Sequence, residues 1–144
     1  MSFIQMDFAG VKEPQAVAPG RYGLTITTAQ HRSDKNDLVV SMGIEGHTDA
    51  PNVRHFISLP KKEDEADKVY FKKLMLNRFL VQFKIPFDAS NGFNLEDFVG
   101  AHATAQLTLS EPDDSGNIYN RLQLDKMPAE GTNSAGSRLP PPKS

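Results

Sequence analysis

The sequence contains no cysteine, and this absence excludes three kinds of chemistry. A chain without thiols forms no disulfide, gives no thiolate to a metal ion and has no cysteine nucleophile. An oxidising compartment therefore has no support, and we expect the protein to work in a reducing cytoplasm.

The sequence also lacks a large excess of either positive or negative charge. The 16 Lys and Arg residues are offset by 18 Asp and Glu, which gives a formal net charge of −2. This balance argues against a protein that holds nucleic acid through a strongly basic surface or tail. A local basic groove remains compatible, because affinity follows the charges at the site and not their sum over the chain.

Long hydrophobic runs are absent as well. The N-terminal segment MSFIQMDFAG has no basic region followed by a long apolar core, so it does not read as a signal peptide. No apolar run approaches the length that a membrane-spanning helix needs. We therefore expect a soluble intracellular protein without a membrane partner.

Motifs for catalysis or for binding a cofactor are not evident. The four histidines lie without the spacing of metal ligands, at positions 31, 47, 55 and 102. The sequence has no Gly-rich phosphate loop, nucleophile elbow or Ser/His/Asp spacing. We expect no metal, no cofactor, no small-molecule substrate and no catalysis, and a hydrolase or nuclease is the weakest hypothesis.

The length and composition indicate one domain with two flanking segments. At 144 residues and 38% hydrophobic composition, the chain can bury one core. Residues 1–18 contain Pro14 and read as an irregular N-terminal arm. Its aromatic side chains either cover a neighbouring surface or swap onto a second subunit. Residues 19–127 form the predicted domain. Residues 128–144, rich in Gly, Ser, Asn and Pro, are predicted to be a disordered tail.

Inside the predicted domain, alternating segments flank one helical segment. Three alternating apolar-polar runs precede it and two follow it. The strand-like runs are Gly20–Ser33, Asp37–Glu45, Val53–Leu59, Ala101–Ser110 and Asn117–Lys126, and the helix-like run is Lys61–Lys84. This β-β-β-α-β-β order predicts an all-β fold with one main helix, the five-stranded OB-fold barrel, in which the helix plugs one end.

The spacing of apolar residues in each element predicts which side chains face the core. On the last strand the pattern points Ile118, Leu122 and Leu124 inward. On the helix, one apolar face is formed by Val69, Leu76, Phe79, Leu80 and Phe83, and a second stripe by Tyr70, Leu74 and Val81. One face can plug the barrel. The second needs another cover, which could be the 85–93 loop, the N-terminal arm or a partner subunit, so a homodimer is possible.

Two arginine-aromatic pairs are the candidate binding residues. Arg54 and Phe56 lie two apart on the third strand, on the side opposite the core set, and Tyr119 and Arg121 do the same on the fifth. An aromatic side chain beside an arginine on a solvated sheet face offers a stacking platform with a phosphate contact. The alternative is that Phe56 and Tyr119 pack under loops or in a dimer interface.

Basic residues near two loops extend this candidate site. His31, Arg32 and Lys35 lie where the first strand turns into the second, a loop that OB-fold ligands often contact. Lys61 and Lys62 follow the third strand and could extend a basic rim. A plain solvated turn is the alternative for the first group. The helix cations Lys68, Lys72, Lys73 and Arg78 are predicted to be solvated.

Several short motifs together resemble a known family. They are the run APGRYGLTITTAQHRSDKNDLVVSMGIEG, the segment NLEDFVG at 94–100, and the turn and strand DSGNIYNR at 114–121. Together they resemble the small single-domain DNA-binding proteins of phage replication and recombination modules. The resemblance covers about residues 19–127 and implies an OB fold, binding of single-stranded DNA, no catalytic activity and, for a phage protein, the host cytoplasm.

The tail departs from better-known bacterial single-stranded-DNA-binding proteins. Those carry an acidic tip that recruits partner enzymes, whereas this chain ends Pro-Pro-Pro-Lys-Ser. The leading hypothesis is a non-catalytic protein that protects single-stranded DNA by stacking and phosphate contacts. The alternative is a structural or adaptor barrel, in which Phe56, Tyr119 and the second helix stripe form a protein interface.

Overall fold

The computed structural model describes residues 2–11 and 13–127, so the tail predicted at 128–144 lies outside the described residues. The larger elements are β1 (Gly20–Arg32), β2 (Asp37–Ile44), β3 (Val53–Ser58), α1 (Ala66–Gln82), β6 (His102–Leu109) and β7 (Asn120–Gln123). Between α1 and β6 lie a two-stranded ribbon, β4 (Phe87–Asp88) and β5 (Gly92–Phe93), and the 3-10 turn η1 (Leu95–Asp97).

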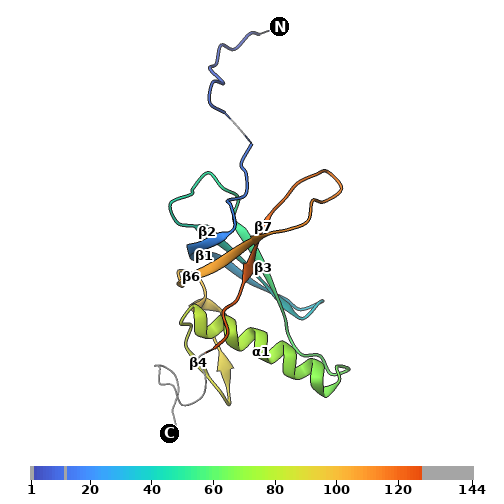
Figure 1. Ribbon diagram of the computed structural model, residues 1–144. Coiled ribbons are helices and arrows are strands. Elements are labelled where there is room, and N and C mark those ends of the chain that lie inside the picture. Colours follow the sequence, from blue (N-terminus) through green and yellow to red (C-terminus); the bar gives the residue numbers. More distant parts are fainter. Residues whose placement is uncertain (1, 12, 128–144) are drawn as a thin grey trace.

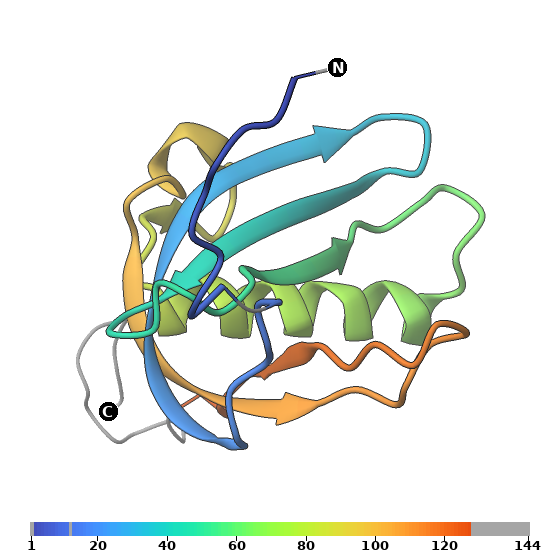
Figure 2. The same ribbon diagram turned by 90° about the horizontal axis from the view of Figure 1, so that it is seen from above.

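Five strands form a nearly closed antiparallel barrel. Their order is β3-β2-β1-β6-β7, and each hydrogen-bonded pair is antiparallel. The two outer strands, β3 and β7, approach each other across the gap in the barrel. Helix α1 lies across one end of the barrel (Figure 1) and is seen between β3 and β7 from above (Figure 2). The predicted OB-fold-like barrel with one main helix is therefore confirmed.

The core lies inside the barrel and against the helix. The alternating inward residues of β1, β2, β3 and β6 are largely buried as their period predicts, except that Leu109 at the end of β6 is 43% exposed, and α1 adds Phe79, Leu80 and Phe83. The ring of Phe79 stacks on those of Phe83 and Phe98, at centroid distances of 4.6 and 5.6 Å. Phe98 reaches this position from the segment after η1, where Gly100 adopts the positive φ of 91° that the turn into β6 requires.

Helix α1 is shorter at both ends than the predicted 61–84. At its start the Asp64 carboxylate accepts a 2.8 Å hydrogen bond from the backbone N–H of Lys61 and a 2.7 Å bond from Lys72 Nζ. These contacts hold the preceding residues in a separate turn. At its end the N–H groups of Lys84 and Ile85 bond back to the carbonyls of Val81 and Leu80, while Lys84 takes a φ of 55°. This is a Schellman ending, which stops the helix before Pro86.

The second helix stripe is only partly covered within the described residues. Leu74 and Val81 are half-buried, whereas Tyr70 is 69% exposed. Phe71, which the helical pattern did not single out, is 58% exposed beside it. The N-terminal half of the helix therefore presents two aromatic rings to solvent.

The last strand begins later than predicted, and the inward placement of Ile118 is wrong. Residues before Asn120 belong to a wide loop in which Asp113 Oδ1 accepts bonds from the backbone N–H groups of Ser115 and Asn117. Ile118 lies in this loop and is 44% exposed. The inward side of β7 instead begins with Asn120, which is buried and hydrogen-bonded to Val17 of the N-terminal arm.

The remainder of the arm extends away from the barrel (Figure 1). Its large apolar side chains lie in solvent, namely Phe3, Ile4, Met6, Phe8 and Val11. Within residues 2–11 and 13–18, only the segment near Val17 packs against the core. The described arm therefore covers no neighbouring apolar surface with its aromatic residues.

Candidate functional site

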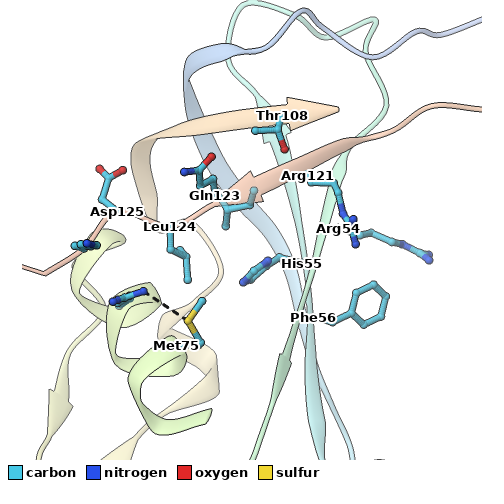
Figure 3. Close-up of a pocket in the computed structure, with 12 residues that line it drawn as sticks. Arg54, His55, Phe56, Met75, Thr108, Arg121, Gln123, Leu124 and Asp125 are labelled. Carbon is cyan, nitrogen blue, oxygen red and sulfur yellow. Dashed lines mark hydrogen bonds between the residues drawn. The ribbon is translucent and has the colours of Figure 1, made fainter. Parts of the chain in front are cut away.

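A pocket of about 830 Å³ lies where β3 and β7 face each other above the middle of α1. We call it the seam pocket, because it opens where the two outer strands of the barrel meet. Figure 3 shows side chains entering it from β3, α1, β6 and β7. Its lining is Arg54, His55, Phe56, Met75, Arg78, Thr108, Arg121, Leu122, Gln123, Leu124, Asp125 and Lys126.

Three of the predicted binding residues meet at this pocket. Arg54 and Phe56 project from β3 on the side opposite Val53 and Ile57, as the alternation predicted. Arg121 reaches the same space from β7 and lies beside Arg54 in Figure 3. Residues more than sixty positions apart in the chain are thus brought together by closure of the barrel.

Two further cations line the pocket that sequence reasoning did not assign to the site. Lys126 follows β7, and Arg78 comes from α1. Arg78 was predicted to be solvated, but it is half-buried. Its Nε is buried without a hydrogen-bond partner in the protein, and its Nη1 makes only a 3.8 Å contact with Met75 Sδ (dashed in Figure 3).

The charge of the pocket differs from that of the whole chain. Four cationic side chains line it, and Asp125 is its single carboxylate. That carboxylate accepts two bonds from Arg21, of 3.1 and 2.9 Å, which hold the Asp125 pKa below its ordinary value. Among the residues the structure describes, no acid forms an ion pair with the four cations. The seam pocket is therefore locally positive in a chain of net charge −2.

The pocket also has an apolar part. Met75, Leu122 and Leu124 contribute hydrocarbon and thioether surface. His55 also lines the pocket, and its ring stacks on Phe79 at a centroid distance of 5.5 Å and an interplanar angle of 7°. Burial lowers the pKa of His55 to about 4, so this side chain is neutral near pH 7 and adds no charge.

Arg32, a predicted binding residue, is paired with an acid in the structure. Its guanidinium donates bonds of 2.9 and 2.7 Å to the Asp37 carboxylate and lies 5.4 Å above the ring centroid of Phe56. The pair raises the pKa of Arg32 and lowers that of Asp37, chiefly through these hydrogen bonds. The charge of Arg32 is thus balanced by Asp37, and its guanidinium packs over the ring of Phe56.

The remaining basic residues gather at the far end of β3. Asn36 donates a 3.0 Å bond from Nδ2 to the carbonyl of Pro60, and its own carbonyl accepts from the N–H of Leu59. These bonds tie the β1–β2 turn, which carries Lys35, to the segment that carries Lys61 and Lys62. The side chain of His31 is exposed and hydrogen-bonded to that of Asn36, with 3.1 Å between His31 Nε2 and Asn36 Oδ1. This cluster lies beyond Phe56, outside the seam pocket.

Tyr119 does not join Arg121. Because β7 begins at Asn120, Tyr119 lies in the preceding loop, where its hydroxyl donates a 3.2 Å bond to Asp113 Oδ2. The ring is 49% exposed. The second arginine-aromatic pair is therefore divided, with Arg121 in the pocket and Tyr119 on the loop.

Within residues 2–11 and 13–127, no three His, Cys, Asp or Glu side chains gather in a way that could hold a metal ion. In the same part of the chain, no helix has the length and apolar character to cross a membrane.

Comparison with known proteins returns no relative: no family model matches the chain, and a search of curated proteins finds no match. What the site can bind is therefore read from its own side chains.

Proposed function

We propose that this protein is a non-catalytic single-stranded-DNA-binding protein, and that the strand runs along β3 and past the seam pocket. The observation that carries the proposal is the grouping of four cations, Arg54, Arg78, Arg121 and Lys126, around a pocket with Phe56 at its rim; none of the four pairs with an acid among the described residues. Proteins that hold single strands combine a positive groove for phosphates with aromatic side chains for bases.

An unpaired strand fits this surface better than a duplex. The ring of Phe56 is 52% exposed and offers a stacking surface, which only an unstacked base can use. The apolar lining of Met75, Leu122 and Leu124 likewise suits the face of a base, which a duplex keeps stacked inside. The cluster of Lys35, Lys61 and Lys62 extends the positive track beyond Phe56.

The biological role proposed with this activity is protection of single-stranded DNA during phage replication and recombination, in the host cytoplasm. Its support is the resemblance of residues 19–127 to the small DNA-binding proteins of phage modules, together with the barrel that the resemblance implied.

The direct test is fluorescence anisotropy with labelled oligo-dT, poly-rA and duplex DNA at two salt concentrations. We expect oligo-dT to bind most tightly at low salt and duplex DNA least tightly. Affinity should fall as salt rises, because phosphate contacts release counterions. Failure of the wild-type protein to bind oligo-dT at low salt would refute the proposal, and preference for poly-rA would reassign the ligand to RNA.

A matched pair of variants locates the binding surface. Replacing both Arg54 and Arg121 by Gln removes two unpaired pocket cations, whereas replacing Lys61 and Lys62 by Gln removes two cations from the rim. We expect the pocket pair to weaken oligo-dT binding more strongly. A larger effect from the rim pair would move the strand away from the seam.

A second candidate is an adaptor barrel that assembles with protein. It is favoured by the exposed Phe3 and Phe8 of the arm and by Tyr70 and Phe71 on α1. Light scattering separates the two candidates. A defined dimer or larger assembly from a protein that binds no oligonucleotide would favour the adaptor, in which these aromatic residues form the interface.

A further inference from the structure

Among the described residues that line the seam pocket, Arg78 is the one with a buried side-chain polar atom that has no hydrogen-bond partner. A guanidinium has five N–H donors, yet within residues 2–11 and 13–127 the side chain of Arg78 makes a single hydrogen-bond contact, the 3.8 Å approach to a methionine sulfur. Its Nε is buried and has no partner in that part of the chain. Leaving a buried donor unsatisfied costs stability, and the cost is larger for a charged group. An arginine in this state indicates a ligand that the protein alone does not supply.

The neighbouring charges indicate the sign of that ligand. Arg54, Arg121 and Lys126 line the same pocket, and the carboxylate of Asp125 is already held by Arg21. Cations gathered without acids repel one another until an anion joins them. The planar fork of a guanidinium matches phosphate geometry, which favours a phosphate group among possible anions.

The remaining lining indicates what the phosphate is attached to. Met75, Leu122 and Leu124 provide an apolar surface in the same cavity, and the volume of about 830 Å³ exceeds what a bare phosphate needs. Pockets of roughly 300–1,000 Å³ typically hold small organic molecules. A nucleotide carries both parts, an anionic phosphate and a flat base with apolar faces.

We propose that the seam pocket holds one nucleotide turned out of the bound strand, with its phosphate on Arg78 and its base against Met75, Leu122 and Leu124. This subsite rests on the proposed function, since the nucleotide belongs to the strand along β3. It gives α1 a direct part in binding, in addition to closing the barrel. A strand bound only along β3 and Phe56 would leave Arg78 without a contact.

The test compares Arg78→Met with Lys73→Met in the full chain. Both variants remove one cation from α1, but Lys73 is exposed and does not line the pocket. We expect Arg78→Met to bind oligo-dT about tenfold or more weakly at low salt. The slope of log affinity against log salt should shrink by about 0.7, the value for one lost phosphate contact on a single strand. Lys73→Met should change neither quantity.

Thermal unfolding of the same variants separates binding from structure. Because Arg78 is unsatisfied in the free protein, Arg78→Met should melt no lower than the wild type. If it does melt lower, Arg78→Gln, which lacks the charge but keeps polar atoms, is measured in its place with the same expectation for the slope. A wild-type slope in the charge-free variant overturns the subsite while the proposed function stands. Absence of oligonucleotide binding by the wild type overturns both.

Discussion

The guanidinium of Arg32 lies 5.4 Å above the ring of Phe56 while both of its outward bonds go to Asp37. The ring is therefore supported from one side by a cation whose charge is already balanced. A cation above an aromatic face is attractive, and it limits the rotamers of an otherwise exposed ring. A stacking surface that is held in place before binding loses less conformational entropy when a base arrives.

Removing this ring should weaken binding without harming the fold. We expect Phe56→Ala to reduce oligo-dT affinity by about 1–3 kcal/mol, the typical value for one stacked base. Anisotropy titration at low salt gives the affinity. Tyr70→Ala is the matched control, since it removes a similarly exposed aromatic side chain from α1. Equal affinity of Phe56→Ala and the wild type would show that no base stacks there.

Stability should depend on pH through His55. Its pKa is about 4 in the fold and near 6.5 in the unfolded chain, so the unfolded state binds more protons between these values. The contribution is therefore complete above pH 6.5 and is lost as the pH falls toward 4, by on the order of 3 kcal/mol. Urea unfolding from pH 7 to 4 measures it. His55→Phe should keep the stack on Phe79 and lose this step, and an unchanged step would assign it to other groups.

The buried side-chain amide of Asn120 should contribute substantially to the free energy of unfolding, although Asn120 lies at the end of a strand. Its side chain exchanges two 2.9 Å hydrogen bonds with the backbone of Val17. Asn120→Ala leaves these backbone groups unsatisfied, and we expect a loss of about 1–3 kcal/mol in unfolding free energy. Limited proteolysis should also cut the arm faster near residues 13–18. Gln123→Ala, an exposed change on the same strand, should do neither.

Truncation of the central aromatic residue should remove a large part of the stability of the fold. Phe79 is fully buried and stacks on His55, Phe83 and Phe98. We expect Phe79→Ala to cost about 3–5 kcal/mol, against a total stability of roughly 5–15 kcal/mol for a domain. Urea unfolding measures the loss. Phe71→Ala on the exposed side of the same helix should change stability by about 0.5 kcal/mol or less.

The alternation of the strands was sufficient to predict the barrel and part of the site. Arg54 and Phe56 were placed outside the core because Val53 and Ile57 alternate with them, and the structure agrees. The period of two says nothing about where a strand begins. The start of β7 is set by Asn120 and Val17, which are 103 positions apart, so Ile118 and Tyr119 were assigned to a strand that had not yet begun.

Arg78 and the boundaries of α1 could not be read from the local pattern for a similar reason. A helical wheel shows which residues share a face, but not that β3 and β7 will meet above Met75 and Arg78 to form a pocket. The first residue of the helix was predicted too early because an acidic residue such as Asp64 is common in the first turn of a helix. Its bonds to Lys61 and Lys72 instead fix a separate turn.

The two outer strands of the barrel share no ladder of backbone hydrogen bonds in the part of the chain that the structure describes. Each therefore has an open edge, and open edges invite another copy of the chain to add a strand. Arg54 on β3 and Arg121 on β7 place like charges along these edges, so two molecules that approach edge to edge repel each other. We therefore expect the cations beside the seam to disfavour edge-to-edge pairing between two copies of the isolated protein.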